Sequence, residues 1–214
     1  RRIHVGGGWQ GQDPALRNAT TVEVAAGATA RANATAAGDG GEVVFWSDDT
    51  TRFAGNIEVR GGETGGDGGR AEVSGKQVLG YSGRTDASAA RGGTGDLLLD
   101  PDNVTIRAGG TGSGGIGGSL VYVSDLEAQN ANVTLLAGGS NGGSIHFEDL
   151  FLNGGDGRLT MQNNVGLRLE VTSPDNNKAG SITFANAANT IEVSGTGYIY
   201  MQAGTGGGGS VGTC

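Results

Sequence analysis

The chain has 214 residues, of which 45 are glycine and 3 are proline, so glycine is about three times as frequent as in an average protein. This composition excludes a collagen triple helix, which needs glycine at every third position and abundant proline, and a helical bundle, where each glycine costs roughly 1 kcal/mol. The hydrophobic content of 36% argues against disorder, and the net charge of −8 argues against nucleic acid and anionic membranes as partners. We therefore expect many short strands joined by tight turns, and no membrane insertion, because no run of 18 apolar residues occurs.

Short islands of alternating apolar residues, each closed by glycine, asparagine or aspartate, predict β-strands along the whole chain. In chain order their apolar positions are Val43 and Phe45, Ile57 and Val59, Leu97 and Leu99, Val104 and Ile106, Leu120 and Tyr122, Val133 and Leu135, Ile145 and Phe147, Leu159 and Met161, Leu167, Leu169 and Val171, Ile182 and Phe184, Ile191 and Val193, and Ile199 and Met201. No segment keeps a period of 3.6 residues, so no long helix is expected.

The islands also repeat one another in two cassettes. One begins with paired glycines, as in GGEVVF (40–45), GGRAEV (68–73), GGSLVY (117–122) and GGSIHF (142–147). The other begins with asparagine, as in NIEVRGG (56–62), NVTIRAGG (103–110), NVTLLAGG (132–139) and NTIEVSG (189–195). Imperfect repetition every 20 to 30 residues is typical of a solenoid.

The short spacing of the strands selects among repeat folds. Five or six turn residues cannot hold a crossover helix, and a hairpin meander would leave exposed edges and needs Asn-Gly turns that this sequence lacks at the right places. We therefore predict an all-β fold, a parallel β-helix (solenoid) of roughly ten coils of about twenty residues each.

Several sequence blocks resemble filamentous haemagglutinin-type large exoproteins, the passengers of two-partner secretion systems. These blocks are GDGGEVVFWSDDTTRFAGNI (38–57), GGDGGRAEVSGK (65–76) and LLLDPDNVTI (97–106). The resemblance implies a right-handed β-helix, export through an outer-membrane secretion pore partner, and adhesion or filament formation at the surface of a Gram-negative bacterium. We expect one β-helical segment over 1–214, with family-like blocks over 1–110, irregular coils over 111–203 and a glycine-rich end over 204–214.

The function expected from these features is a non-enzymatic structural and adhesive rod that binds a host surface or a carbohydrate receptor. The alternative is a carbohydrate-active enzyme that uses outward-facing carboxylates, namely Asp48, Asp49, Asp100, Asp102, Glu148 and Asp149. A third reading is a narrow binding module, for instance for a host protein or a haem carrier. Two distant histidines and one terminal cysteine give no zinc-type spacing, and we assign no catalytic, cofactor or metal residue.

Four Asn-x-Thr sequons, at Asn18, Asn33, Asn103 and Asn132, are candidate glycosylation sites, although asparagine and threonine are also favoured at turns and edges. Trp46, Tyr198 and Tyr200 alternate against apolar neighbours, so we expect them to face outward as surface contacts or to lie under a loop.

Cys214 is the only cysteine. It is either a candidate for an intermolecular disulfide or simply the point where the sequence stops. Unprotected end coils would favour a homo-polymer formed by end-to-end stacking.

Overall fold

The computed structural model of the chain describes residues 1–109, 118–139, 142–172, 180–204 and 210–213. Within these residues the chain forms short strands, a 3-10 helix, η1 (Trp9–Gly11), and one α-helix, α1 (Val123–Glu127). Strands lie in or beside every alternating island of the sequence, so the prediction of strands at these positions is confirmed.

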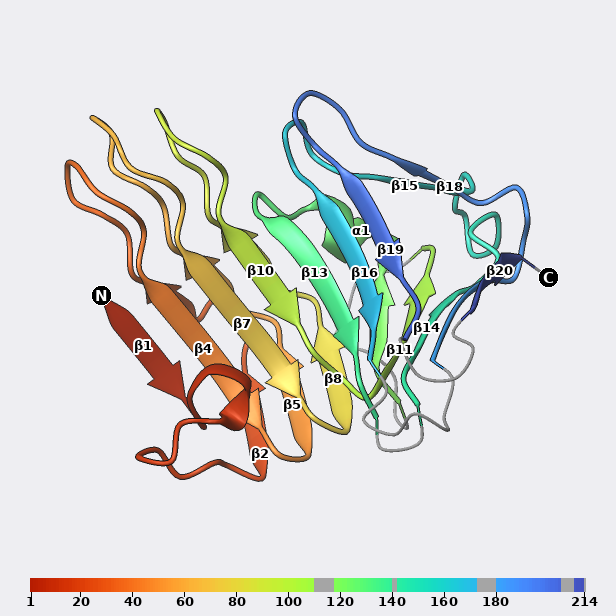
Figure 1. Cartoon of the computed structure of the whole chain (residues 1–214), viewed down its shortest axis with the longest axis horizontal. Coiled ribbons are helices and arrows are strands. Elements are labelled where there is room, and N and C mark those ends of the chain that lie inside the picture. Colours follow the sequence, from red (N-terminus) through yellow and green to blue (C-terminus); the bar gives the residue numbers. More distant parts are fainter. Residues whose placement is uncertain (110–117, 140–141, 173–179, 205–209, 214) are drawn as a thin grey trace.

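A seven-stranded parallel sheet lies across the front of Figure 1. In spatial order its strands are β1 (Arg2–Val5), β4 (Glu42–Ser47), β7 (Arg70–Gly75), β10 (Asp96–Leu99), β13 (Asn132–Ala137), β16 (Leu167–Val171) and β19 (Ile199–Gln202). Each strand up to β16 pairs with the one that follows it after two other strands in the sequence.

The second long sheet has eight parallel strands. In spatial order they are β2 (Thr21–Val24), β5 (Thr50–Phe53), β8 (Val78–Tyr81), β12 (Leu120–Tyr122), β11 (Asn103–Arg107), β14 (Ser144–Phe147), β17 (Ser181–Phe184) and β20 (Ser210–Thr213). Two small parallel sheets complete the set, one of β3 (Thr29–Arg31), β6 (Asn56–Glu58) and β9 (Arg84–Asp86), the other of β15 (Arg158–Thr160) and β18 (Thr190–Glu192).

The core lies between these sheets and is built from the inward-facing residue of each alternating pair. The rings of Phe45 and Phe53 lie 4.9 Å apart, and the rings of Phe53 and Tyr81 stack at 5.7 Å. The buried Tyr81 hydroxyl donates to Gln129 Oε1 at 2.9 Å, so this polar atom keeps a hydrogen bond inside the core.

The predicted fold class, an all-β right-handed parallel β-helix (solenoid), is corrected by the strand order. Successive strands of the seven-stranded sheet begin 26 to 40 residues apart, whereas coils of about twenty residues were expected, because each interval also contains strands of the other sheets and long loops. In the eight-stranded sheet β12 lies between β8 and β11, out of sequence order. The described residues thus form mostly parallel sheets with a short helix, a sheet type that fits an α/β fold, and no regular solenoid.

Candidate functional site: the polar face of the small sheet

An array of polar side chains covers the outer side of the three-stranded sheet. Strand register places these residues in rows across the three strands, while the alternating Ile57, Val59 and Ala87 point inward and are buried. Backbone bonds from Ala34 to Arg60 and from Gly61 to Ser88 continue the pairing past the strand ends. We call the outward residues the polar face: Thr29, Asn56 and Arg84; Arg31, Glu58 and Asp86; and Asn33, Arg60 and Ser88.

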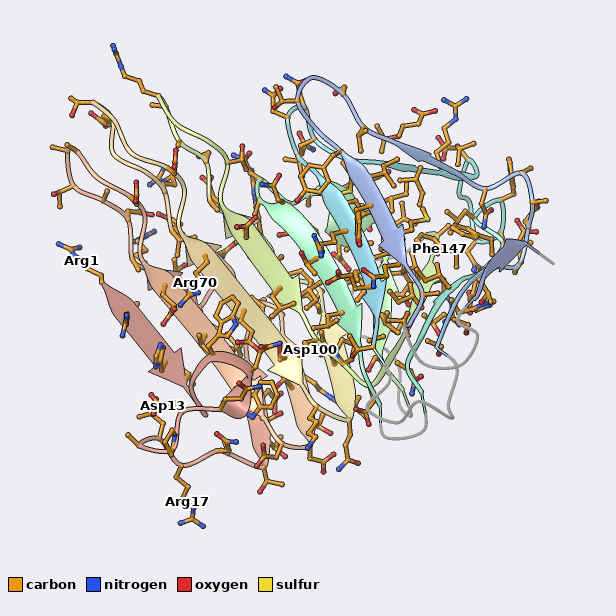
Figure 2. The ribbon with its side chains drawn as sticks, viewed as in Figure 1. Arg1, Asp13, Arg17, Arg70, Asp100 and Phe147 are labelled. Carbon is orange, nitrogen blue, oxygen red and sulfur yellow. The ribbon has the colours of Figure 1, made fainter. Side chains whose placement is uncertain are left out.

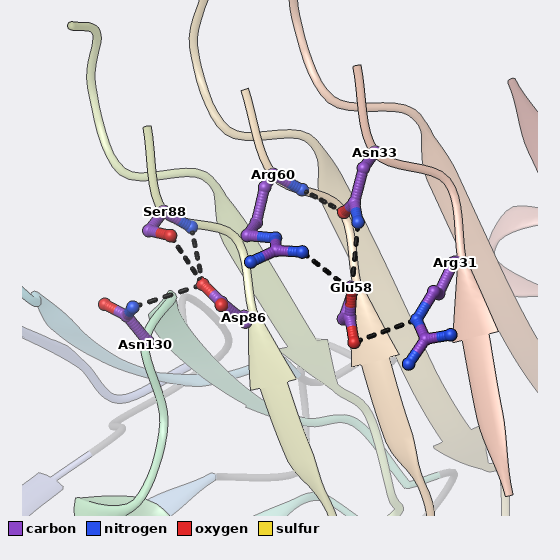
Figure 3. Close-up of polar contacts among 7 residues, drawn as sticks. All are labelled: Arg31, Asn33, Glu58, Arg60, Asp86, Ser88 and Asn130. Carbon is purple, nitrogen blue, oxygen red and sulfur yellow. Dashed lines mark hydrogen bonds and ion pairs between the residues drawn. The ribbon is translucent and has the colours of Figure 1, made fainter. Parts of the chain in front are cut away.

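Glu58 is the centre of the polar face (Figure 3). Its carboxylate accepts hydrogen bonds from Arg31 Nε at 3.0 Å, from Asn33 Nδ2 at 2.9 Å and from an Arg60 guanidinium nitrogen at 3.1 Å. The bonds from Asn33 and Arg31 hold the pKa of Glu58 below its usual value, since they favour the charged form. Two arginines are thereby fixed in place by one acid.

Asp86 is held in the neighbouring strand by a separate set of bonds (Figure 3). Its Oδ1 accepts from the Ser88 hydroxyl at 2.6 Å, from the Ser88 backbone N–H at 3.1 Å and from Asn130 Nδ2 at 3.1 Å. Every one of these bonds ends on the same oxygen, which leaves Oδ2 as an acceptor without a partner among the described residues.

The row of Thr29, Asn56 and Arg84 contrasts with the rest of the polar face. The side chains of these three residues make no hydrogen bond or ion pair with the other residues that the structure describes. They line a hollow of about 330 Å³ together with Ile57 and the four other charged residues of the polar face, Arg31, Glu58, Arg60 and Asp86. Free donors and acceptors in a hollow are the groups that a polar ligand needs.

A second hollow, of about 400 Å³, lies along the polar face and shares Arg60 with the first. Its lining includes Asn33, Ser88 and Glu63 as well as small alanine and glycine residues. The lining of both hollows contains no aromatic residue, so recognition there rests on hydrogen bonds and charge.

A second polar feature is a pair of carboxyls at the front sheet, of which Glu72 is buried and Asp100 is partly buried. Glu72 in β7 is fully buried and accepts bonds from the Gln10 backbone N–H at 2.8 Å and from the Ser74 hydroxyl at 2.8 Å. Burial raises the pKa of Glu72 to about 7, although these hydrogen bonds oppose the shift. Burial likewise raises the pKa of Asp100 to about 6. A long hydrogen bond of 3.5 Å from Gln10 Nε2 opposes this shift.

Residues 6–20, which we call the covering segment, lie over Glu72 and Trp46 on this part of the sheet. Trp9 in this segment lies under the guanidinium of Arg70, 4.5 Å from Cζ to the ring centroid. Figure 2 shows Arg70 and Asp100 on the front sheet beside this segment. The covering segment therefore lies over Glu72, which is fully buried, whereas Asp100 is only partly buried.

Trp46 faces away from the core, as the alternation predicts, but its exposure is only 6%. The indole lies under a loop, which is the second of the two predicted alternatives, because the covering segment packs on it. Its Nε1 donates to Asp48 Oδ1 at 3.0 Å, and Gly7 and Gly11 lie so close to the ring that a Cβ at either position would overlap it. The expectation of Trp46 as a surface contact is corrected for this reason.

The six carboxylates of the enzyme alternative lie in three separate turns, after β4, β10 and β14. Several are held by neighbours. Asp48 accepts from Trp46 and Asn18, and Glu148 accepts two bonds of 2.6 Å from Arg107, which lower the pKa of Glu148. Three of the others accept hydrogen bonds: Asp49 from Thr50, Asp149 from Phe151 and Asn186, and Asp100 from Gln10. Burial raises the pKa of Asp102, and the charge of Lys76 opposes this shift.

The four sequon asparagines occupy different surroundings. Asn33 belongs to the polar face, and Asn18 Nδ2 donates to Gly11 O and to Asp48. Asn103 is exposed and accepts from Ser144, whereas Asn132 bridges two strands by donating to Thr94 O and accepting from the Gly166 N–H. Glycosylation stays a prediction at each, and of the four Asn103 is the exposed one.

The remaining predicted residues are placed as follows. Tyr198 and Tyr200 are 44% and 39% exposed, and Arg168 lies over the Tyr200 ring at 4.4 Å; a ligand contact there stays a prediction. Cys214 lies outside the described residues. In the part of the chain that the structure describes, no three metal-ligating side chains gather, and no helix has the length and apolar character needed to cross a bilayer.

Sequence reasoning did not single out the polar face or Glu72. The signal for the polar face was present in the cassette NIEVRGG (56–62), whose alternation directs Asn56, Glu58 and Arg60 to one side. The strand residues that complete the face, such as Arg31 and Arg84, lie in segments without an apolar alternation. Only the observed strand register brings them together.

Comparisons with known proteins assign no family. No protein-family model matches the chain, and no curated protein matches it significantly. The resemblance to filamentous haemagglutinin-type exoproteins therefore stays an expectation that rests on the sequence blocks themselves.

Proposed function

We propose that the chain is a non-enzymatic structural and adhesive segment of a secreted bacterial surface protein, and that its polar face binds a host surface or a carbohydrate receptor. The observation that carries this proposal is the row of Thr29, Asn56 and Arg84, whose free polar groups line a hollow on a regular sheet. A row of this kind offers donors and acceptors to sugar hydroxyls.

The sheet beneath the polar face supports this role because its backbone register fixes where the side chains start, and because Arg31 and Arg60 are held by Glu58 before a ligand arrives. Ile57, Val59 and Thr85 are buried directly under it, and Glu58 fixes two of its arginines. Preorganised groups lose little conformational entropy on binding, which raises the affinity that a small number of contacts can give.

The enzyme alternative has weaker support. Glycoside hydrolysis needs two carboxyl groups about 5 to 9.5 Å apart across a cleft that admits the substrate. The carboxylates expected to face outward lie in three separate turns, and among them Glu148 is ion-paired with Arg107. Glu72 is fully buried beneath the covering segment, and Asp100, which is partly buried, accepts a bond from Gln10 of that segment.

The export route and the surface location follow from the sequence resemblance. We propose secretion through an outer-membrane pore partner to the surface of a Gram-negative bacterium, on the strength of the blocks between residues 38 and 106. The amount of chain that cells release into the medium, compared with and without the pore protein, tests this route. Assembly into an end-to-end homo-polymer stays a prediction.

Binding to a host surface tests the adhesive proposal. We expect labelled chain to bind cultured epithelial cells, and the double variant Asn56→Ala, Asp86→Ala to bind at least tenfold less. The variant loses the amide of Asn56, from the row with free polar groups, and the carboxylate of Asp86, from the neighbouring row. The matched control is Asp156→Ala, Asn163→Ala, which changes the same residue types at exposed positions elsewhere. Equal loss in both double variants, or no loss in either, would contradict the proposal.

A further inference from the structure

The hollow beside Arg84 carries a positive charge on an otherwise acidic molecule. Its lining contains three arginines, Arg31, Arg60 and Arg84, against two acids, Glu58 and Asp86, whereas the whole chain has a net charge of −8. Among the described residues no side chain neutralises Arg84, while Arg31 and Arg60 both bond to Glu58. One unpaired guanidinium therefore faces the hollow.

The surroundings of Arg84 restrict the anion that it can take. Thr29 and Asn56 stand in the same row and offer neutral hydroxyl and amide groups. Glu58 and Asp86 stand in the next row, where their negative charges repel a ligand that carries many anionic groups. A planar carboxylate matches the two parallel N–H bonds of a guanidinium, and the acceptor Asp86 Oδ2 suits a sugar hydroxyl.

From this geometry we propose that the hollow binds the carboxylate of an acidic sugar, with Arg84 as its charge partner and with Thr29 and Asn56 bonded to hydroxyls of that sugar. The inference rests on the proposed adhesive function, because it names the ligand class of the same polar face. The site favours a sugar that carries one negative charge and suitably placed hydroxyls. A densely sulfated chain fits it less well.

Titration of the purified chain with matched saccharides tests this ligand class. One arm compares trigalacturonate with its methyl ester, and a second arm compares 3′-sialyllactose with lactose, so the two arms separate a uronate source from a terminal sialate source. A sulfated heparin tetrasaccharide is the third probe. We expect at least one carboxylated probe to bind at least tenfold more tightly than its neutral counterpart and more tightly than the sulfated probe.

Two variants assign the binding to Arg84. Arg84→Gln removes the charge from the hollow and is expected to weaken binding of the carboxylated probe at least tenfold. Arg17→Gln removes another exposed arginine, from the covering segment (Figure 2), and is expected to leave binding unchanged. Both positions are exposed, and circular dichroism of each variant checks that the fold is kept.

Several results overturn the inference. These are equal binding of carboxylated and neutral probes, tighter binding of the sulfated probe, equal loss in both variants, and no binding of any carboxylated probe. If cell binding is still lost in Asn56→Ala, Asp86→Ala but kept in Arg84→Gln, the adhesive function stands and the acidic-sugar assignment fails. If neither change alters cell binding, the proposed function itself fails.

Discussion

Burial couples the charge state of Glu72 to the stability of the fold. Its carboxyl is fully buried in the front sheet, and the pKa is raised from 4.5 to about 7. Between these two values the folded chain holds a proton that the unfolded chain has released, so the free energy of unfolding falls as the pH rises. The pKa of Asp100 is raised from 3.8 to about 6. Asp100 therefore also lowers the free energy of unfolding as the pH rises, over a lower pH range.

Glu72→Gln should remove most of this dependence. We expect the wild-type chain to lose on the order of 3 kcal/mol of unfolding free energy between pH 4.5 and 8 through Glu72, and the variant to be more stable than the wild type at pH 8. Urea unfolding at pH 5 and pH 8 measures both quantities. Glu63→Gln, at an exposed acid, is the control; the same pH slope in wild type and Glu72→Gln would contradict the assignment.

At the scale of elements, the covering segment is the part that converts an outward sheet face into buried structure. It contacts the sheet through the backbone of Gln10, which bonds to Glu72, and through the packing of Gly11 on Trp46. Gly11 has a φ of +64°, so both its backbone conformation and the lack of a side chain are used.

Replacement of Gly11 by alanine separates these two requirements when it is compared with Gly27→Ala. Gly27 has a φ of +89° but nothing within 4 Å of the added Cβ. We expect each variant to lose about 1 kcal/mol from the strained backbone, and Gly11→Ala to lose roughly 2 kcal/mol more because the methyl group overlaps Trp46. Urea unfolding with tryptophan fluorescence measures both losses; similar values for the two variants would show that the indole contact is unimportant.

The alternation in the sequence was enough to predict which elements exist and which side of most strands faces the core. Val43 and Phe45, for example, are buried in β4 as the pattern requires. The same pattern could not show that Trp46 is covered, because the cover comes from residues 6–20, which carry no periodic signal. It also placed Leu120 and Tyr122 on one side, whereas Val121 is the residue that joins the core.

At the scale of the whole molecule, the sheets are joined by side chains that meet between them. Phe53 of β5 contacts the Phe45 ring of the front sheet and the Tyr81 ring of its own sheet. Loss of this ring would therefore weaken contacts between sheets as well as within one.

Phe53→Ala should lower the free energy of unfolding by about 3 to 5 kcal/mol, since a large buried ring is replaced by a cavity. Phe151→Ala is the matched control: Phe151 is 48% exposed, and the expected loss is about 0.5 kcal/mol or less. Urea or thermal unfolding measures both values. A loss for Phe53→Ala as small as that for Phe151→Ala would contradict the described core.

The arrangement of the strands into sheets was less accessible from the sequence than the strands themselves. The repeats showed that similar strands recur, but the loops between them differ in length, and repeat spacing alone gave coils that were too short and too regular. β12 pairs with β8 out of sequence order, and Val121 of β12 joins the core together with Val123 and Leu126 of α1. The polar face likewise appears only once β3, β6 and β9 are in register, since its residues are 27 or 28 positions apart.

The most direct test of the central claim measures binding and turnover of glycans in the same samples. Three proteins are incubated with an array of neutral and acidic oligosaccharides: the wild type, the double variant Asn56→Ala, Asp86→Ala, and the double variant Asp156→Ala, Asn163→Ala. The bound and soluble sugars are then analysed by mass spectrometry. We predict that the wild type and the double variant Asp156→Ala, Asn163→Ala retain intact acidic oligosaccharides, and that the double variant Asn56→Ala, Asp86→Ala does not. Cleaved products in the wild-type sample, or equal retention by all three proteins, would contradict an adhesive role for the polar face.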